Sequence, residues 1–165
     1  MNLAKTLVIG NTGAGKSWLS ERLASARGNT WVDLDLFNWE PGGYNVSRKR
    51  EDVIAMARAA ASGEGWVMEG IYGWIASEIL PLATALVWIN IDESECVANI
   101  HQRGMRRGAT TQSFKALLEW AMTYRSRNGS SAHTAHASLF KSFTRDKACL
   151  KTRDQVTTFS RAFYR

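Results

Sequence analysis

The sequence predicts an α/β fold in which a parallel β-sheet is covered by helices on both faces. Short apolar runs alternate with segments of helical periodicity along the chain, which is the pattern of repeated strand–helix units. The run at residues 85–91 is continuously apolar, as expected of a strand buried on both faces. A glycine-rich loop also follows the first apolar run and opens the first helical segment. In sheets of this class, ligands bind at the carboxyl ends of the strands.

Each expected strand is a short apolar run that ends at a glycine, a charged residue or a turn. The five runs lie at residues 6–9, 30–34, 66–69, 85–91 and 148–151. Between them, apolar residues spaced three and four apart predict helices. These helices are expected near residues 19–26, 53–60, 92–104, 114–127, 139–143 and 156–163, with Ser47 as the N-cap of the second. The Ser-, Ala- and His-rich stretch at residues 128–138 is expected to be a loop.

The composition fits one globular domain spanning residues 1–165. The chain has 165 residues, of which 45% are apolar and 22% charged, enough for one sizeable core and too few for a second. Its two cysteines have neither metal-type spacing nor the number needed for a disulfide scaffold, which favours a reducing compartment. The sequence shows neither the layout of a signal peptide nor an apolar run long enough to span a membrane. We therefore expect a cytoplasmic protein, and the oligomeric state stays open.

Charge is distributed unevenly along the chain. The net charge is +6, but residues 1–82 carry 8 basic and 9 acidic side chains, whereas residues 83–165 carry 13 basic and 6 acidic ones. The first half is therefore nearly neutral and the second half strongly basic. Such asymmetry predicts an anionic partner, which composition alone leaves open among nucleic acid, a membrane surface and a phosphorylated small molecule.

Residues 10–17, Gly-Asn-Thr-Gly-Ala-Gly-Lys-Ser, match the G-x-x-x-x-G-K-[ST] phosphate-binding loop (P-loop) in full. Glycines let consecutive backbone N–H groups converge on phosphate oxygens, and the following helix adds the positive end of its dipole. Lys16 is expected to act in catalysis at the β- and γ-phosphates, and the Ser17 hydroxyl to ligate Mg²⁺. A chance glycine turn is the alternative, and the strand–loop–helix context argues against it. The residues expected to bind ATP here are Gly10, Asn11, Thr12, Gly13, Ala14, Gly15, Lys16, Ser17 and the adjacent Trp18.

Carboxylates follow the second and third expected strands. Asp33 and Asp35 are two residues apart, so at strand periodicity they share one face. Asp33 is expected to hold Mg²⁺ through water, and Asp35 to accept the proton of an acceptor hydroxyl as a general base. Glu69 is expected to face the metal from the other side, and Gly70 to allow the acceptor close to the backbone. The alternatives are a helix cap or a solvated turn for the two aspartates, and an exposed strand tip for Glu69.

Aromatic residues cluster in the loops that follow these acids. Flat rings at this rim are suited to stacking on a flat substrate, and equally suited to packing against the core. Both interpretations stay open, with Phe37, Trp39 and Tyr72 as the expected substrate contacts. The aromatic residues concerned are Phe37, Trp39, Tyr44, Tyr72 and Trp74.

Arginines flanked by glycines follow the fourth expected strand and its helix. Such a segment is suited to closing over phosphates, because planar guanidinium groups match the oxygens of a transferring phosphoryl group. We expect a lid at about residues 103–112, with Arg103 and Arg107 acting on the phosphates. A second pair ends the next helix, where Arg125 is expected to be catalytic and Arg127 to bind the acceptor. The alternative for both pairs is a favourable interaction with a helix carboxyl terminus.

Two histidines lie within the polar stretch. His133 and His136 are three residues apart, a spacing that resembles a metal pair. The sequence offers no evident third ligand, so we expect both to be solvated loop histidines.

Together these residues resemble the P-loop small-molecule kinases of the nucleoside monophosphate kinase and shikimate kinase type. The sequence is more similar still to adenylate-kinase-like proteins labelled DNA topology modulation proteins. The similarity extends over nearly the whole chain, with the P-loop as its specific part. Besides residues 10–17, it rests on Leu-Asp-Leu-Phe-Asn-Trp-Glu-Pro-Gly at 34–42, Trp-Val-Met-Glu-Gly-Ile-Tyr at 66–72, Leu-Glu-Trp at 118–120 and Tyr-Arg-Ser-Arg at 124–127.

This resemblance implies a three-layer α/β/α fold with a five-stranded parallel sheet in the order 2-3-1-4-5, ATP on the P-loop and an arginine-bearing lid. By match to the shikimate kinase Asp-x-Asp pattern, it implies that Asp33 serves Mg²⁺ and Asp35 the acceptor. By match to nucleotide kinases, it implies that Arg153 lies beside the adenine. Two residues depart from the pattern: Glu69 replaces the usual aspartate, and Trp18 stands where a small residue is common.

The sequence thus predicts an ATP-dependent kinase acting on a small-molecule acceptor such as a nucleotide or nucleoside, with ATP and Mg²⁺ as cofactors and no membrane partner. The P-loop, the strand-end carboxylates and the arginines favour this function, because phosphoryl transfer depends on positioning and charge stabilisation. The alternative is a nucleic-acid-binding or regulatory P-loop ATPase that modulates DNA topology, which the basic second half favours. The sequence shows no helix-turn-helix or RNP-type signature, so nucleic acid is the less favoured partner.

Overall fold

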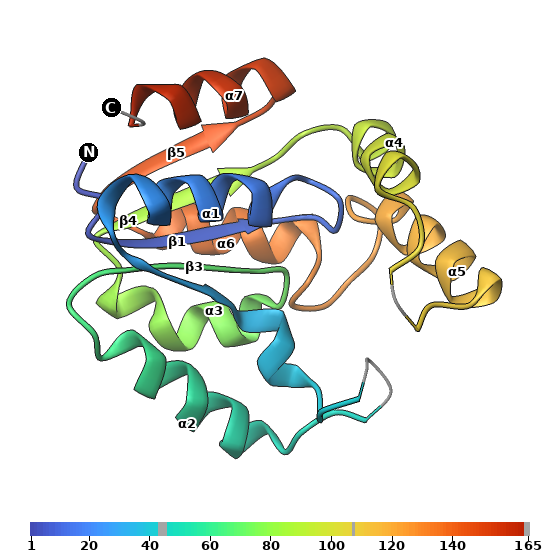
Figure 1. The fold of residues 1–165 in the computed structure, drawn as a ribbon, viewed down its shortest axis with the longest axis horizontal. Helices are drawn as coiled ribbons and strands as arrows, with labels where there is room; N and C mark the ends of the chain where they lie inside the picture. Colours follow the sequence, from blue (N-terminus) through green and yellow to red (C-terminus); the bar gives the residue numbers. More distant parts are fainter. Residues whose placement is uncertain (43–45, 107, 164–165) are drawn as a thin grey trace.

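The computed structural model describes residues 1–42, 46–106 and 108–163, and it contains a five-stranded, fully parallel sheet (Figure 1). The strand order is β2-β3-β1-β4-β5, which confirms the predicted fold class and strand order. The strands are β1 (Lys5–Gly10), β2 (Thr30–Asp33), β3 (Trp66–Gly70), β4 (Ala85–Ile89) and β5 (Asp146–Leu150).

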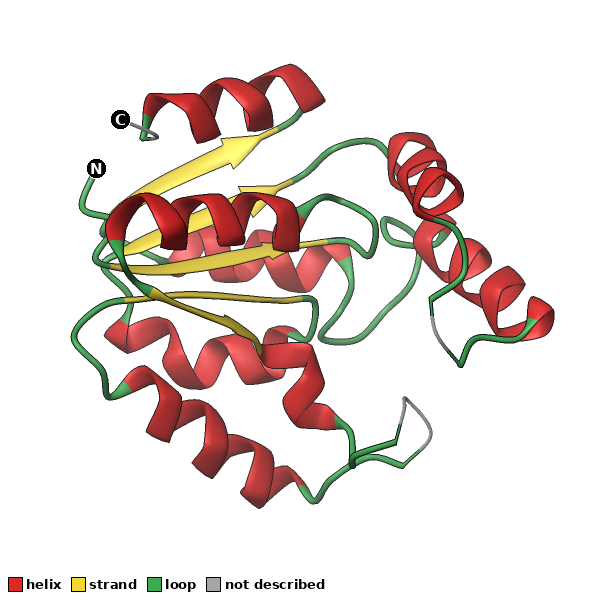
Figure 2. Ribbon diagram, viewed as in Figure 1, coloured by secondary structure: helices red, strands yellow, loops and turns green. Residues whose placement is uncertain are grey.

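Helices cover both faces of the sheet and give the molecule three layers (Figure 2). The helices are α1 (Lys16–Arg27), α2 (Arg50–Ala61), α3 (Gly73–Ile79), α4 (Glu93–Arg103), α5 (Thr111–Met122), α6 (His133–Ser142) and α7 (Arg153–Ala162). α1 and α7 cover one face and α2, α3 and α6 the other, whereas α4 and α5 project beyond the carboxyl ends of the strands. Over the described ranges, the structure holds no helix of the length and apolarity needed to cross a membrane.

Alternation along the central strand divides the core into two layers. Leu7 and Ile9 of β1 pack with residues of α2 and α3, whereas Val8 packs with residues of α1 and α7. All three side chains are fully buried. The central strands are therefore apolar on both faces, which explains why these runs show no alternation of polar and apolar residues.

The strand register brings the predicted site residues to one edge of the sheet. Asp33 pairs with Glu69 across β2 and β3, and Ile9 pairs with Gly70 across β1 and β3. Because all five strands are parallel, their carboxyl ends meet at the same edge, beside the start of the P-loop. The fold alone thus places the phosphate loop next to the strand-end carboxylates.

Several local predictions were wrong. α3 and a short 3-10 helix, η1 (Leu34–Asn38), lie in segments for which no helix was expected. α6 begins at His133, so half of the expected loop at residues 128–138 is helical. The N-cap of α2 is Lys49 rather than Ser47, which instead forms a bridge with Trp39. β5 begins at Asp146, because an edge strand tolerates the exposed charged residues at its start.

Residues 104–110 connect α4 to α5 at the place expected for the lid. Gly104 ends α4 with a φ of 74°, a conformation that favours glycine. Thr110 begins α5 with a capping box, in which its side chain and that of Ser113 each accept a hydrogen bond from the other's amide. We call residues 103–112 the lid segment; Arg107 within it lies outside the described residues.

Candidate active site

A cavity of about 970 Å³ opens at the carboxyl ends of the strands. Its walls come from the P-loop, the loops after β2 and β3, α4, the lid segment, α5 and the start of α7. The predicted site residues that line it are Thr12, Gly13, Ala14, Gly15, Lys16, Ser17, Trp18, Asp33, Asp35, Trp39, Glu69, Tyr72, Arg103 and Arg153. The other predicted residues that the structure describes lie outside the lining: Gly10, Asn11, Phe37, Gly70, Arg125 and Arg127. Tyr44 lies outside the described residues, as Arg107 does.

The P-loop glycines are required by close approach and by backbone conformation. Gly13 has a φ of 73°, and a Cβ there would lie 2.5 Å from the Cys96 carbonyl oxygen and 2.8 Å from Ile100 Cγ1. Gly15, with a φ of 94°, is the N-cap of α1 and has open space where its side chain would be. The loop is thus pressed against α4 on one side and faces the cavity on the other. Its backbone N–H groups and the amino end of α1 are suited to an anion.

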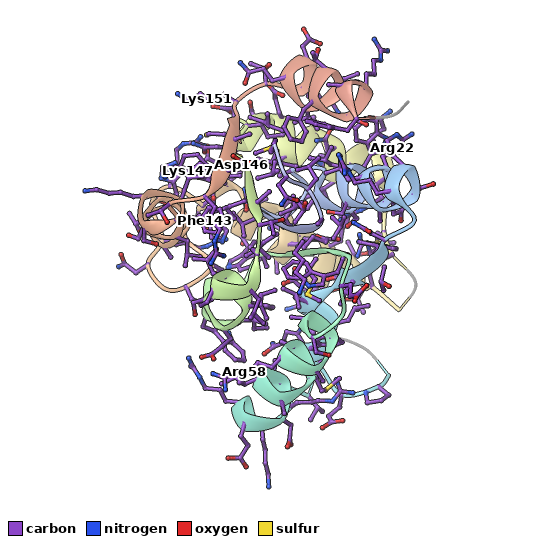
Figure 3. The ribbon with its side chains drawn as sticks, turned by 90° about the vertical axis from the view of Figure 1, so that its left-hand side faces the viewer. Arg22, Arg58, Phe143, Asp146, Lys147 and Lys151 are labelled. Atoms are coloured by element: carbon purple, nitrogen blue, oxygen red, sulfur yellow. The ribbon has the colours of Figure 1, made fainter. Side chains whose placement is uncertain are left out.

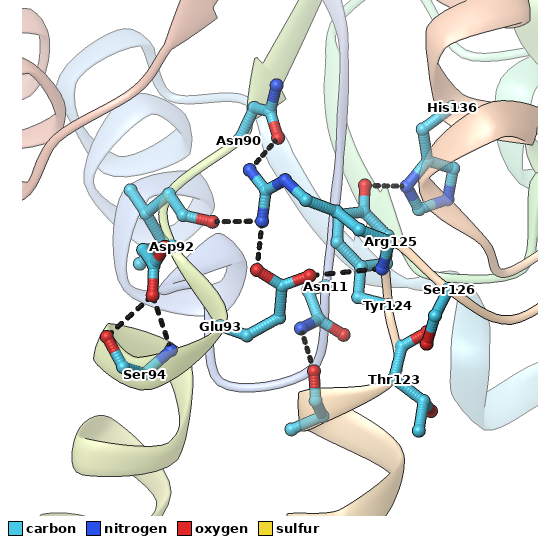
Figure 4. A network of polar contacts seen from close by, with 12 residues as sticks. Asn11, Asn90, Asp92, Glu93, Ser94, Thr123, Tyr124, Arg125, Ser126 and His136 are labelled. Atoms are coloured by element: carbon cyan, nitrogen blue, oxygen red, sulfur yellow. Dashed lines mark hydrogen bonds and ion pairs between the residues drawn. The ribbon is translucent and has the colours of Figure 1, made fainter.

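Two asparagines fix the P-loop to the helices around it. Asn11, which is buried, donates from Nδ2 to the Ala121 carbonyl oxygen at 2.8 Å (Figure 4). Its side-chain oxygen accepts from the Thr12 amide at 2.9 Å. Asn99 of α4 donates from Nδ2 to the Gly13 carbonyl oxygen at 2.8 Å. Asn11 was predicted to bind ATP, and Asn99 was assigned no role from the sequence. The structure places Asn11 outside the cavity lining and shows that both side chains hold the loop in shape, which only the folded packing makes visible.

Lys16 is the cation that faces the site's carboxylates. It is only 8% exposed, and Nζ donates to the Asn11 carbonyl oxygen at 3.1 Å. Its positive charge lowers the pKa of both Asp35 and Glu69. A buried ammonium group beside this loop favours an anionic ligand.

Asp35 is held by the backbone that follows β3. The Ile71 amide donates to Oδ1 at 2.9 Å and to Oδ2 at 3.1 Å. Burial raises the pKa of Asp35 to about 6, Lys16 opposes this rise, and the negative charge of Asp33 adds to it. The carboxylate is therefore enclosed and held in one orientation, and its pKa lies closer to neutral pH than that of an ordinary aspartate. These properties suit a general base.

Gly70 contributes by having no side chain. A Cβ there would lie 2.8 Å from Asp35 Oδ1 and 3.3 Å from Leu34 Cβ. The Gly70→Ala variant is therefore expected to displace the Asp35 carboxylate and to lower phosphoryl transfer by about tenfold, because small misplacements of a reacting group are costly. Affinity for an ATP analogue, measured by calorimetry, should change little. A Gly63→Ala variant is the matched control, since a Cβ there meets only a carbonyl oxygen at 3.9 Å.

Asp33 has a structural contact as well as a place in the cavity. Its side chain caps η1 by accepting the Asp35 amide at 2.9 Å. The helix-cap alternative for Asp33 therefore describes a real contact, and the residue still lines the cavity beside Glu69. One oxygen accepts the Asp35 amide, and this bond sets the orientation of the carboxylate toward the site.

Glu69 provides the strongest indication of a cation. It is 2% exposed, and Oε1 has no hydrogen-bond partner in the part of the chain that the structure describes. Burial raises the pKa of Glu69 to about 7, and the Ser17 hydroxyl and Lys16 oppose this rise. A buried carboxylate oxygen beside a P-loop serine fits Mg²⁺, which takes one or two carboxylates and completes its shell with phosphates and water. Across the described ranges, no three His, Cys, Asp or Glu side chains form a closed metal site.

The pKa of Glu69 leads to a stability prediction. Between pH 4.5 and about 7 the folded protein binds a proton at Glu69 that the unfolded chain has released, so this group lowers the free energy of unfolding as pH rises. The Glu69→Gln variant should therefore raise the melting temperature at pH 8 by roughly 5–10 °C, from about 3 kcal/mol, and by little at pH 4.5. Scanning calorimetry without nucleotide measures this. Equal melting temperatures at pH 8 for Glu69→Gln and for the exposed-site control Glu64→Gln would contradict it.

The aromatic residues divide between the two interpretations left open by the sequence. Phe37 and Trp74 pack against the core, and Arg50 lies over the Trp74 ring at 4.5 Å. Trp39 and Tyr72 line the cavity. The same wall includes Phe114 and Trp120 of α5, which sequence analysis did not assign. The sequence shows only that the apolar residues of this segment have helical spacing. Their contact with the cavity depends on the position of α5, which the sequence does not reveal.

Trp18 and Arg153 mark the end of the cavity between α1 and α7. Trp18 is 40% exposed, and the Arg22 guanidinium lies 4.0 Å from the centre of its ring. Arg153 is the first residue of α7 and lines the cavity with Val156. This end of the cavity therefore carries an indole ring and a guanidinium group.

Arg125 and Arg127 are held by the protein itself. The Arg125 guanidinium forms an ion pair with Glu93 and donates to Asn90 Oδ1 at 2.9 Å (Figure 4). Arg127 donates to the carbonyl oxygens of Trp120 and, at 2.6 Å, Ser131, and it stacks on the Trp120 ring at 3.9 Å. The structure therefore does not bring them to the cavity lining. Arg103 and Arg106 of the lid segment do line it, and Arg106 had not been assigned a role.

The two histidines lie in α6 rather than in a loop. His136 is fully buried, and its ring nitrogens bond to the Tyr124 hydroxyl and the Ile71 carbonyl oxygen. His133 packs its ring on Trp88 and Tyr124, with centroids 5.0 and 5.4 Å apart. The expectation of solvated loop histidines was therefore wrong. The polar composition of this segment hid the fact that one face of the helix is buried.

Comparison with known proteins shows a likeness in structure. No protein-family model matches the sequence, and no curated protein sequence matches it. A shikimate kinase from Acinetobacter baumannii, in complex with shikimate, is 12% identical, with a TM-score of 0.57 over 98% of this chain and 90% of that one. A gluconokinase from Sinorhizobium meliloti is 15% identical, with a TM-score of 0.57 over 99% and 91%. A shikimate kinase from Bacteroides thetaiotaomicron is 14% identical, with a TM-score of 0.56 over 95% and 94%.

At such identities the likeness concerns the fold. It gives no support to the expected link with DNA topology modulation proteins. The chain has the fold of P-loop small-molecule kinases.

Proposed function

We propose that this protein is a kinase that transfers the γ-phosphoryl group of ATP to a hydroxyl group of a small molecule. The observation that carries the proposal is that two groups line the same cavity: the P-loop lysine, Lys16, and the Asp35 carboxylate, which the Ile71 amide holds in place. A P-loop alone supports nucleotide binding. The added carboxylate, with its pKa raised by burial to about 6, supports transfer to an acceptor that must lose a proton.

On the ATP side, the P-loop amides and Lys16 bind the phosphates, and Trp18 and Arg153 lie beside the base. Mg²⁺ bound with ATP would neutralise charge that develops during transfer. Ser17 and Glu69 would hold it, with Asp33 acting through water. Glu69 supports this role through its orphaned Oε1 in a buried position.

On the acceptor side, Asp35 accepts the proton of the attacking hydroxyl, and the Ile71 amide keeps the carboxylate in place. Trp39, Tyr72 and Trp120 form an aromatic wall for the body of the acceptor. This wall supports an acceptor with a flat or apolar face, such as a nucleoside. Shikimate-like and gluconate-like acids are further candidate acceptors, because proteins of similar fold are a shikimate kinase and a gluconokinase. Arg103 and Arg106 in the lid segment supply positive charge for the transferring group.

The fate of the basic side chains supports a small-molecule partner over nucleic acid. Arg125 and Arg127 are held as described, and Arg145 donates to the Pro81 carbonyl oxygen at 2.8 Å. Lys147 donates to two carbonyl oxygens at the end of α6, those of Phe140 and Phe143, both at 2.7 Å. Figure 3 shows Lys147 and Lys151 on the face of the molecule that is turned toward the viewer. Part of the charge excess thus stabilises the fold. A salt titration of DNA binding tests this: nanomolar affinity that falls steeply with salt would favour the nucleic-acid alternative.

A thermal-shift screen tests the kinase proposal. The protein would be combined with Mg²⁺ and a non-hydrolysable ATP analogue, then with nucleosides, nucleotides, sugars, shikimate and gluconate. A ligand at 100 times its Kd stabilises by about 2.7 kcal/mol, which raises the melting temperature by roughly 5–10 °C. Phosphorylated product from each hit would then be identified by mass spectrometry with ATP. Absence of any shift with the ATP analogue would contradict the proposal at its first step.

A further inference from the structure

A continuous chain of hydrogen bonds runs through the interior behind the acceptor end of the cavity. Trp88 Nε1 of β4 donates to the Tyr124 hydroxyl oxygen at 3.0 Å. The Tyr124 hydroxyl lies 2.6 Å from His136 Nδ1 (Figure 4). On the other side of the ring, His136 Nε2 lies 2.8 Å from the Ile71 carbonyl oxygen. Tyr124 and His136 are fully buried and Trp88 is 6% exposed. The chain therefore links the segments after β3 and α5 to β4 and α6 without solvent.

The partners fix the protonation of each member. A carbonyl oxygen can only accept, so His136 Nε2 carries the hydrogen and donates to Ile71. Nδ1 then accepts from the Tyr124 hydroxyl, whose oxygen receives the indole N–H of Trp88. Burial lowers the pKa of His136 to about 4. The hydrogen bond to the Ile71 carbonyl oxygen opposes this shift, and the positive charges of Lys16 and Arg127 add to it. His136 is thus a neutral imidazole that donates from Nε2 to the Ile71 carbonyl oxygen and accepts at Nδ1 from the Tyr124 hydroxyl.

The end of this chain is the residue that holds the proposed general base. Ile71, 4% exposed, donates its amide to Asp35, and its carbonyl oxygen is the group that His136 binds. The same segment is bound a second time, because the Gly73 amide donates to the Ser130 carbonyl oxygen at 2.9 Å. A rotation of Ile71 would move both its amide and its carbonyl. The bond from His136 therefore restricts the direction in which the amide meets Asp35.

We propose that His136 is a positioning residue for phosphoryl transfer, which fixes the Ile71 backbone and through it the Asp35 carboxylate. The inference rests on the proposed function for its effect on catalysis, but the contact itself is measurable without it. The last turn of α5 and the residues that follow it serve both substrates in this arrangement. Ala121 binds Asn11 of the P-loop, and Tyr124 orients His136 behind the acceptor site.

Three histidine variants separate positioning from simple packing. In His136→Gln the amide nitrogen stands near the place of Nε2, so the bond to Ile71 is retained. In His136→Asn the shorter side chain reaches Tyr124 but not Ile71. His133→Asn is the matched control, because it makes the same change three residues earlier in α6, where the ring stacks on Trp88 and Tyr124.

The first measurement is the proton shift of the Ile71 amide in ¹⁵N-labelled protein, with Mg²⁺ and a non-hydrolysable ATP analogue present. His136→Asn should move this resonance upfield, because its bond to Asp35 weakens, whereas His136→Gln and His133→Asn should leave it near its wild-type position. The second is transfer to an acceptor from the screen. His136→Asn should lower kcat by about tenfold with the KM for ATP within twofold, and His136→Gln should restore it.

Each outcome decides the inference. An unmoved Ile71 resonance in folded His136→Asn would overturn it, as would equal effects of the Asn and Gln variants or the same effect in His133→Asn. If His136→Asn does not fold, Tyr124→Phe replaces it: loss of the hydroxyl frees the imidazole, so the Ile71 resonance should still move, and an unmoved one overturns the proposal. If no small molecule is phosphorylated, the proposed function fails, while the Ile71 resonance still reports on the contact.

Discussion

Replacing Lys16 by alanine is expected to lower phosphoryl transfer by about 10³-fold or more, which is the size of effect seen when a charged stabiliser of a transition state is removed. Lys16 is buried beside the P-loop and is the cation that opposes the raised pKa values of Asp35 and Glu69. Without Lys16, the γ-phosphate of ATP loses its positively charged partner. The repulsion between the bound phosphates and the carboxylates of Asp35 and Glu69 is then no longer offset by a positive charge from Lys16. A coupled enzyme assay that detects the release of ADP measures the effect.

The matched control is Lys141→Ala. Lys141 is an exposed lysine in the last turn of α6, outside the cavity lining, and its removal changes the net charge by the same amount. Its turnover should equal that of the wild type. Calorimetry with the ATP analogue should show weaker binding in Lys16→Ala alone. Wild-type turnover in Lys16→Ala would remove the basis for the proposed function.

The architecture could be predicted from the sequence because two features act locally. The P-loop needs a strand before it and a helix after it, and the apolar run of β4 needs burial on both faces. α3 was missed because it has only seven residues and no side-chain cap, so its periodicity has too little length to register. The short helix η1 was missed for a similar reason, although its cap, Asp33, had been singled out for another role.

Within the site, the residues that could be predicted are those whose chemistry is carried by a motif. Lys16 and Asp35 follow from spacing along the chain. The ion pair of Arg125 could not be predicted from the sequence, because its partner Glu93 lies 32 residues away and is brought to it by the packing of α4 beside α5. His136 has the same difficulty: its neighbours in sequence are polar, whereas its neighbours in space are Tyr124 and Ile71. Long-range burial decides both cases.

Replacing Asp35 by asparagine is expected to preserve ATP binding and to lower transfer by about 10²–10³-fold, the range for loss of a general base. The asparagine oxygen can still accept the Ile71 amide, so the backbone should keep its place. Because the pKa of Asp35 is about 6, wild-type kcat/KM should rise with pH up to that value and then level off. The residual activity of Asp35→Asn should lack this rise. The exposed Asp52→Asn, in the first turn of α2, is the matched control.

The same substitution should make the protein more stable, which separates loss of a base from damage to the fold. Between pH 3.8 and about 6 the folded protein binds more protons at Asp35 than the unfolded chain does, so the free energy of unfolding falls as pH rises through this window. Asparagine removes that penalty, so the melting temperature of Asp35→Asn at pH 8 should exceed that of the wild type, while at pH 3.5 the two should be close. An inactive variant that is also less stable at pH 8 would indicate that Asp35 acts in folding. An inactive variant with a higher melting temperature is the signature of a carboxylate kept at a cost in stability for its chemistry.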